Sequence, residues 1–189
     1  FAKPERENCD GYAYDPENPS QHIIDMSENE IEVPEDYTRE ELRQDLLCYT
    51  SPVLKENLVL TGDMTAELYI SSDAPDTDFV VRVTDVDENG RSIKLADGLL
   101  SARYRNGFAR SEFLQEGEIV CLKIRTTKLS NCFRKGHRIR VTVTSSAKNF
   151  IFPNSNTREG FASARTVVAH NRVYHGGLHA SRLTVRVEP

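Results

Sequence analysis

Apolar and polar residues alternate with a period of two along most of the chain after Pro52, and this pattern constrains the fold more than any other feature. In MTAELYIS, Ala66, Leu68 and Ile70 fall on one face of an extended segment, because successive side chains of a strand point to opposite sides. The pattern returns in three further segments, DFVVRVTDV, EIVCLKIRTT and KGHRIRVTVTSS. About eight or nine short strands without intervening helices predict antiparallel sheets packed as a β-sandwich or jelly roll.

Turn residues between these segments support the same architecture. Asp87-Glu88-Asn89-Gly90 separates two strand patterns, and Asn-Gly tolerates the positive φ that a tight hairpin requires. The longest irregular stretch of the β region is NFIFPNSNTREGFASAR, residues 149–165.

The N-terminal part of the chain has a different character. Residues 1–37 are rich in Pro, Asn, Asp and Glu without periodicity, so we expect an extended arm there and the sandwich domain at 38–189. A capping-box pattern from Thr38 to Glu41 predicts a short N-terminal helix of two or three turns that ends near Asp45. LLCYTS, 46–51, precedes Pro52, which favours a strand.

Composition excludes several classes of function. The 189 residues carry a net charge of -5, whereas nucleic-acid binding would need a basic surface. No apolar run approaches the roughly 20 residues of a membrane span, and the first residues do not resemble a signal peptide. The basic cluster of Arg134, Lys135, His137, Arg138 and Arg140 is interpreted as the solvated face of a strand. Four cysteines without metal-type spacing favour a reducing, cytoplasmic setting, with Cys121 as a buried apolar thiol.

We find no catalytic, metal-binding or cofactor-binding motif. The Gly-x-Ser-x-Gly of a nucleophile elbow is absent, and the Ser-Ser pairs at 71–72 and 145–146 are interpreted as strand-edge hydroxyls. His170, His175 and His179 form His-x4-His-x3-His, but a separation of five places the first two on opposite faces of a strand, and neither Cys nor Glu completes a zinc shell. His137 is expected to be a hydrogen-bonded structural histidine.

Asp73, Asp76 and Asp78 form the strongest candidate for a cation site. Calcium prefers several carboxylate and carbonyl oxygens, but the glycine and distal glutamate of an EF-hand are not in register. Aspartates before a strand also form turns. Arg103 and Arg105 in SARYR could neutralise them, so we favour an ion-pair network over calcium.

Long motifs resemble a known family. ISSDAPDTDFVVRVTDVDENGRSIKLADGLLSARYRNG, FLQEGEIVCLKI, FRKGHRIRVTVTSS, the Asn-x-Asn-Thr of PNSNTREG and VVAHNRVYHGGLHASRLTVRV are similar to the C-terminal domain of the Xaa-Pro dipeptidyl-peptidase and cocaine-esterase-like (CocE/NonD) serine hydrolases. YAYDPENP and DLLCYTSPVLKENLVLTG resemble the segment that links into this domain, so the resemblance covers nearly the whole chain.

The resemblance implies a jelly-roll sandwich of galactose-binding-like topology that packs on an α/β-hydrolase catalytic domain and shapes its active-site cleft. The Ser-Asp-His triad of the family lies in that other domain, so the chain alone is expected to be inactive. Two segments depart from the family: residues 19–37 lack its Pro-Thr-x-Gly-Gly stretch, and NFIF replaces a Pro-Arg-Phe element.

Two alternatives remain open for a chain without its own nucleophile. One is a free-standing carbohydrate-binding module, with Tyr69, Tyr104 and Tyr174 as stacking platforms. The other is a protein-interaction module, and an uncovered interface face could also drive homo-oligomerisation.

Overall fold

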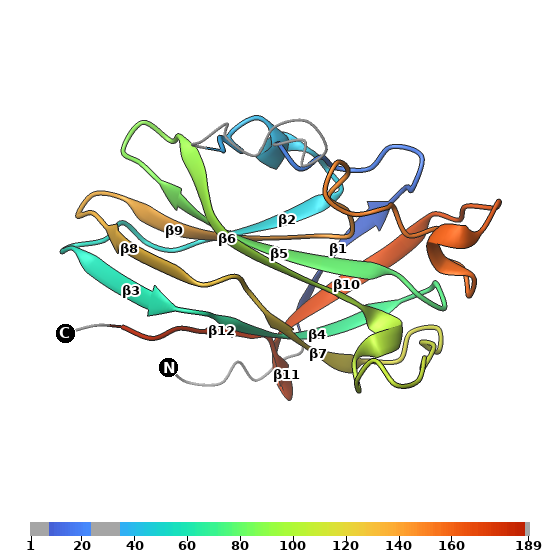
Figure 1. Cartoon of the computed structure of the whole chain (residues 1–189). Coiled ribbons are helices and arrows are strands. Elements are labelled where there is room, and N and C mark those ends of the chain that lie inside the picture. Colours follow the sequence, from blue (N-terminus) through green and yellow to red (C-terminus); the bar gives the residue numbers. More distant parts are fainter. Residues whose placement is uncertain (1–7, 24–34, 188–189) are drawn as a thin grey trace.

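The computed structural model describes residues 8–23 and 35–187 (Figure 1). Nearly all regular structure there is β, with only three single-turn 3-10 helices, η1 (Glu40–Leu42), η2 (Ala102–Tyr104) and η3 (Gly160–Ala162). The strands are β1 (Cys9–Tyr14), β2 (Leu46–Thr50), β3 (Leu58–Gly62), β4 (Thr65–Ser72), β5 (Asp78–Val86), β6 (Ser92–Ser101), β7 (Val120–Arg125), β8 (Leu129–Phe133), β9 (Arg138–Thr144), β10 (Ala169–Gly176), β11 (His179–Ala180) and β12 (Arg182–Thr184).

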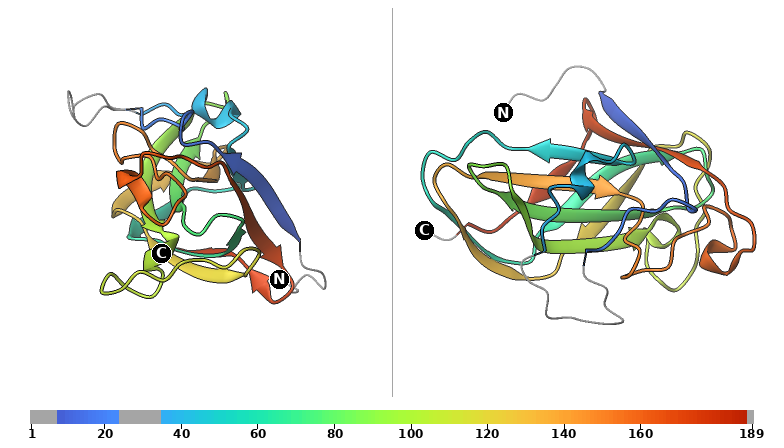
Figure 2. Two further views of the ribbon diagram at one scale, coloured as in Figure 1. Left: turned by 90° about the vertical axis from the view of Figure 1, so that its right-hand side faces the viewer. Right: turned by 90° about the horizontal axis from the view of Figure 1, so that it is seen from above.

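Two antiparallel sheets face each other, as the views of Figures 1 and 2 show. One has the strand order β1-β10-β4-β12, with β7 also paired to β4 and β11 to β10. The other has the order β2-β9-β5-β6, and β3 and β8 form a separate two-stranded ribbon. The predicted antiparallel, mainly β architecture is therefore confirmed.

The core lies between the two sheets. Leu68, Ile70 and Leu122 of one sheet meet Phe79 and Val81 of the other, and all five side chains are buried. Burying each such side chain stabilises the fold by about 1.5–3 kcal/mol. The period-two pattern thus identified the inward-facing residues of β4, β5 and β7.

Strand β5 is buried on both faces. Arg82 and Thr84 point away from the core but have no exposed surface, because residues 20–23 and 35–45 cover the outer face of this sheet. The Arg82 guanidinium lies 3.8 Å from the centroid of the Tyr37 ring, in the geometry of a cation–π contact.

The hairpin predicted at residues 87–90 is confirmed. The Asp87 amide donates to the Arg91 carbonyl, and the Gly90 amide donates to the Asp87 carbonyl. Gly90 has φ +85°, a conformation that glycine adopts at little cost. The Asp87 carboxylate accepts hydrogen bonds from the amides of Asn89 and Arg91.

The predicted N-terminal helix from Thr38 to about Asp45 is wrong, because the chain forms only the single turn η1 before β2 begins at Leu46. The capping box does not form. The Thr38 hydroxyl donates to the Asp36 carboxylate and accepts from the Ser92 amide instead.

Glu41, the expected partner of Thr38 in the capping box, is 8% exposed and points towards the sheet. Its carboxylate lies 2.5 Å from Arg140 Nη1 and accepts a 2.8 Å hydrogen bond from the Ser92 hydroxyl. A buried tertiary ion pair therefore replaces the local cap. The sequence had suggested that Arg140 lies on a solvated face, but its guanidinium pairs with the buried Glu41 carboxylate.

Part of the expected arm belongs to the sandwich. Cys9–Tyr14 forms β1 and pairs along its whole length with β10, and the Tyr14 side chain has no exposed surface. The Ser20 hydroxyl donates to the Ser146 carbonyl at 2.8 Å. Residues 1–7 and 24–34 of that expected arm lie outside the described ranges.

The structure also bears on the membrane-span and cysteine predictions. In residues 8–23 and 35–187, no helix is long and apolar enough to cross a membrane. The four cysteines are free, and Cys121 is only partly buried, because its side chain points away from the core that Leu122 enters.

We expect Glu41→Gln to lower the free energy of unfolding by about 1.5–3 kcal/mol, the range for losing a hydrogen bond between charged groups, because Arg140, 23% exposed, loses its carboxylate partner. Urea unfolding followed by circular dichroism measures this change. Exposed Glu56 provides the control Glu56→Gln, and equal midpoints for the two variants would contradict the anchoring role of Glu41.

Candidate functional site

Three loops meet at one end of the sandwich: residues 73–77, 102–119 and 145–168. We call this the loop end; it lies at the right of Figure 1 and faces the viewer in the left panel of Figure 2. The loops follow β4, β6 and β9 and lead back into β5, β7 and β10. Loops held by a rigid sheet scaffold are the usual positions of functional residues in β-sandwiches.

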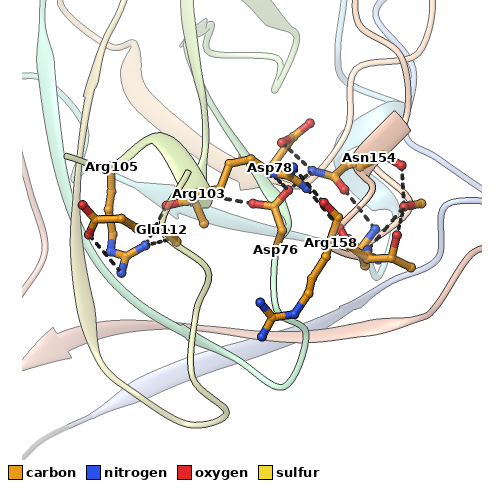
Figure 3. A network of polar contacts seen from close by, with 12 residues as sticks. Asp76, Asp78, Arg103, Arg105, Glu112, Asn154 and Arg158 are labelled. Carbon is orange, nitrogen blue, oxygen red and sulfur yellow. Dashed lines mark hydrogen bonds and ion pairs between the residues drawn. The ribbon is translucent and has the colours of Figure 1, made fainter. Parts of the chain in front are cut away.

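An ion pair between Asp76 and Arg103 lies at the centre of the loop end (Figure 3). Arg103 Nε donates to Asp76 Oδ2 at 2.7 Å, and the Arg103 amide donates to Asp76 Oδ1 at 3.0 Å. Asp76 has no exposed surface. The remaining guanidinium nitrogens donate to the carbonyls of Thr157 and Arg158, both at 3.0 Å. Arg103 therefore connects all three loops.

Asn154 joins a second carboxylate to this network. Its Nδ2 donates to Asp76 Oδ2 at 2.8 Å and to Asp78 Oδ1 at 2.9 Å. Burial raises the pKa of the Asp78 carboxyl above its ordinary value, and the nearby Asp76 charge adds to the shift, whereas hydrogen bonds from Ser101 and Asn154 oppose it. The energy of two neighbouring buried carboxylates is thus offset by one guanidinium and one amide.

The segment 154–160 is held in its path by side chains that bond its own backbone. Asn154 Oδ1 accepts from the Asn156 amide at 3.0 Å, and Asn156, at φ +63°, donates from Nδ2 to the Val167 carbonyl at 2.6 Å. The Ser155 hydroxyl donates to the Gly160 carbonyl at 2.6 Å. Such Asx and Ser/Thr bonds rigidify a loop without regular structure. The Asn-x-Asn-Thr motif therefore specifies a backbone conformation.

The aspartates predicted to form an arginine network rather than a calcium site are Asp73, Asp76 and Asp78. Arg103 pairs with Asp76 as expected. Arg105 does not join the aspartates, since it bonds the Ala102 and Glu112 carbonyls within its own loop. The Asp73 carboxylate instead accepts from the His170 amide at 2.8 Å and lies 2.7 Å from His170 Nδ1. Asp76 and Asp78 share the Asn154 amide as a donor, whereas Asp73 pairs with His170.

Large aromatic side chains project from the loop end. Phe152 and Phe161 are 79% and 74% exposed, and their rings stack at a centroid distance of 5.9 Å. Both line a hollow of about 140 Å³ whose floor includes Asp76, Asp78 and Arg103. Phe108 is 80% exposed on the neighbouring loop. Exposed apolar patches of this kind mark interaction surfaces in soluble proteins.

A wider, open hollow of about 470 Å³ lies beside the aromatic pair. Asp73, Pro75, Thr157, Arg158 and Arg165 contribute to its lining. Its walls carry both signs of charge, and the Arg158 guanidinium is held 4.5 Å from the centroid of the Phe113 ring. The loop end therefore combines apolar rings with a mixed-charge border, a composition typical of protein interfaces.

The serines singled out by the sequence bond to groups other than histidine. The Ser145 hydroxyl contacts the Tyr12 hydroxyl at 2.8 Å and accepts from Asn171 Nδ2 at 2.9 Å. The Ser71 hydroxyl lies 3.0 Å from the Tyr174 hydroxyl. Ser71 lies at the end of β4 and Ser145 directly follows β9, so both lie at strand ends as expected, and both are buried.

The histidines have separate partners. His170 bonds Asp73, and His175 Nε2 lies 3.1 Å from Asp10 Oδ2. His179 lies beside Tyr69 and Tyr174. His137 Nδ1 lies 2.9 Å from Asp85 Oδ1 directly before β9, so its expected structural role is confirmed. Among the residues that the structure describes, no group of three His, Cys, Asp or Glu is arranged to hold a metal ion.

One feature of the loop end could not be foreseen from the sequence. NFIF was noted as a departure from the family, but the pairing of Phe152 with Phe161 was not foreseen, because it depends on the fold of the intervening Asn-rich loop. Of the tyrosines proposed as sugar platforms, Tyr174 is buried and Tyr69 packs against His179.

Comparison with known proteins identifies relatives over nearly the whole chain. Residues 3–184 match the model of a family described as the X-Pro dipeptidyl-peptidase C-terminal non-catalytic domain. The cocaine esterase of Rhodococcus sp. (strain MB1 Bresler) is 35% identical over 188 residues. That match covers 96% of this chain and 32% of the esterase, so the chain spans about a third of the length of this relative.

Solved structures show the same fold. An aminopeptidase from a marine sediment Thaumarchaeota archaeon superposes with a TM-score of 0.91 at 24% identity, covering 100% of this chain and 35% of the aminopeptidase. An α-amino acid ester hydrolase superposes with a TM-score of 0.89 at 23% identity, covering 95% of this chain and 32% of the hydrolase.

We expect Arg103→Met to lower the free energy of unfolding by about 3 kcal/mol, because it leaves the buried Asp76 carboxylate without its cation. Urea titration of the variant measures the loss. Arg110→Met is the matched control, since Arg110 is 83% exposed in its salt bridge to Glu112. A loss no larger than that of the control would show that the Asp76 pair does not hold the loops together.

The raised pKa of Asp78 predicts a pH dependence. Between the ordinary and the raised pKa, the native protein binds more protons than the unfolded chain, so this group stabilises the fold as the pH falls through that interval. The unfolding free energy of the wild type minus that of Asp78→Asn should therefore increase as the pH is lowered from 7 towards 4. Urea midpoints of both proteins across this range test the prediction, and a constant difference would refute it.

Proposed function

Because this chain belongs to the family of X-Pro dipeptidyl-peptidase C-terminal non-catalytic domains, we propose that it packs against the α/β-hydrolase catalytic domain of a serine hydrolase and helps to form the wall of its active-site cleft. The family match over residues 3–184 is the observation that carries this proposal. The reaction belongs to the other domain. This chain supplies a rigid surface, and a cleft between two domains encloses more of a ligand than either surface alone.

We assign the loop end as the surface that meets the catalytic domain. The stacked rings of Phe152 and Phe161 expose more than 70% of their area, and such aromatic side chains dominate binding energy when a partner buries them. The length of the Rhodococcus relative outside the matched region indicates a partner within the same polypeptide.

The polar network beneath the rings suits this role. Arg103 and Asn154 connect the loops at residues 76–78 and 154–158 through short hydrogen bonds. Gly160, at φ +64°, lies so close that an added Cβ would be 3.1 Å from Arg103 Nη2. The rings are therefore presented on a support that loses little conformational entropy on binding, which favours affinity.

The named relatives suggest the substrate class. The family is that of an X-Pro dipeptidyl-peptidase domain, and the similar proteins are an esterase, an aminopeptidase and an α-amino acid ester hydrolase. We infer a parent enzyme that cleaves an ester or amide by acyl transfer to serine.

We also infer a jelly-roll, galactose-binding-like topology and a cytoplasmic location. Strand β10 lies between β1 and β4, and β9 lies between β2 and β5, so sequence-distant strands are neighbours, as in Greek-key connections. The four free thiols accord with a reducing compartment.

The first test is the activity of the 189-residue chain. We expect no hydrolysis of Xaa-Pro amides or simple esters by the purified chain, and a Gly-x-Ser-x-Gly followed by Asp and His in the reading frame before Phe1. If the chain alone hydrolysed these substrates and a serine-directed inhibitor blocked the reaction, the proposal of a non-catalytic domain would be wrong.

The second test addresses the docking surface in the full-length enzyme. Phe152→Ser with Phe161→Ser should lower kcat/KM at least about tenfold, because each buried interface aromatic contributes on the order of 2 kcal/mol, and should separate the thermal unfolding of the two domains. Leu178→Ser is the control, since Leu178 is 79% exposed outside the loop end. Equal effects of the double variant and the control would place the interface elsewhere.

A further inference from the structure

An apolar cleft of about 230 Å³ opens between the two sheets, away from the loop end. Its walls come from the inner faces of both sheets: Ala66 and Leu68 of β4 and Val173 of β10 on one side, Val141 and Val143 of β9 on the other. Leu183 of β12 closes one flank. The cleft is thus an extension of the core that reaches the surface.

A small side chain, Ala66, and a short strand, β12, explain why the core is incomplete here. Ala66 occupies the inward-facing position of β4 beside Leu68, and its methyl group leaves space that a larger side chain would fill. Strand β12, which pairs Leu183 with Ala66, is only three residues long. Interiors are otherwise packed to crystal density, so a gap lined by aliphatic side chains is a distinct feature.

Polar groups at the mouth of the cleft already bond one another. Asp10 accepts a 3.1 Å hydrogen bond from the Tyr49 hydroxyl and lies 3.1 Å from His175 Nε2, which links β2 of one sheet to β1 and β10 of the other. The ring centroids of Tyr49 and His175 are 6.3 Å apart.

The opposite rim is built in the same way. The Tyr69 amide donates to the Ser181 hydroxyl at 2.9 Å, and Arg182 forms an ion pair with Glu67. Lys123 Nζ also lies 3.7 Å from Glu67, so two cations share one carboxylate at this rim. The Lys123 and Arg182 side chains are 71% and 64% exposed, so their charges lie in water outside the apolar walls.

We propose that this cleft binds a small uncharged molecule, or an uncharged group of a larger one, whose apolar body is about the size of a single substituted aromatic ring. Dry apolar cavities of about 150 Å³ bind benzene, and transfer of an apolar surface from water into such a site is favourable. A charged group placed between the aliphatic walls would lose its hydration without a polar partner there. The proposal does not depend on the loop end or on a catalytic domain.

Titration of the isotope-labelled 189-residue chain with toluene tests this site by two-dimensional amide NMR. We expect saturable shifts confined to the amides of β4, β9, β10 and β12 around the cleft. Benzoate, which has the same ring with a carboxylate, should bind at least about tenfold more weakly, since its charge would be desolvated. Absence of saturable shifts with toluene, or equal affinity for benzoate, would overturn the proposal.

Variants that fill the cleft provide the second measurement. Ala66→Leu should weaken toluene binding by about tenfold or more, the scale of a steric change in an apolar pocket. Leu183→Phe fills the space from the other flank and is informative if Ala66→Leu does not fold. Leu178→Ser, outside the cleft, should leave the affinity unchanged. Retention of wild-type affinity in a folded cleft-filling variant would show that toluene binds elsewhere.

Discussion

Burial of β5 on both faces is the constraint on which the rest of the structure depends. Towards the core, Phe79 and Val81 pack against the other sheet. Towards the outside, Arg82 and Thr84 are equally inaccessible, and buried polar groups are costly unless partners are nearby. The Glu41 carboxylate accepts a hydrogen bond from Thr84. The Tyr37 ring covers the Arg82 guanidinium, whose nitrogens have no hydrogen-bond partner among the described residues. What looked like a linker from its sequence is therefore a layer that this strand requires.

The start of β5, at the loop end, also contains buried charges that need partners. Asp76 and Asp78 come directly before and at the start of the buried strand, so their charges cannot reach bulk water. Arg103 and Asn154 compensate them, and in doing so they hold three loops in one arrangement. Phe152 and Phe161 lie on one of these loops, so the same hydrogen bonds also hold the two rings in place. Stability of the strand and presentation of the surface are thus two results of one set of hydrogen bonds.

The molecule divides its tasks between places. The proposed docking surface at the loop end is aromatic, exposed and underlain by the Asp76–Arg103 ion pair, whereas the cleft between the sheets is aliphatic with charged groups only at its rim. The first suits a protein partner, because large rings gain most when buried by a complementary surface. The second suits an apolar group about the size of a single ring, because its volume is about 230 Å³.

Local sequence determined strands β2, β4, β5, β7 and β9, the inward-facing residues of β4, β5 and β7, and the hairpin at Gly90, because each follows from side-chain alternation or turn chemistry. Opposite charge also indicated the Asp76–Arg103 pair. Tertiary structure alone decided that Glu41 would leave its capping box for Arg140, that Cys9–Tyr14 would join the sheet, and that Asp73 would pair with His170. Those outcomes depend on residues far apart in the chain, and long-range burial outweighs the fractions of a kcal/mol to about 1 kcal/mol that a local cap contributes. The pairing of Phe152 with Phe161 and the gap beside Ala66 likewise arose only when the sheets were assembled.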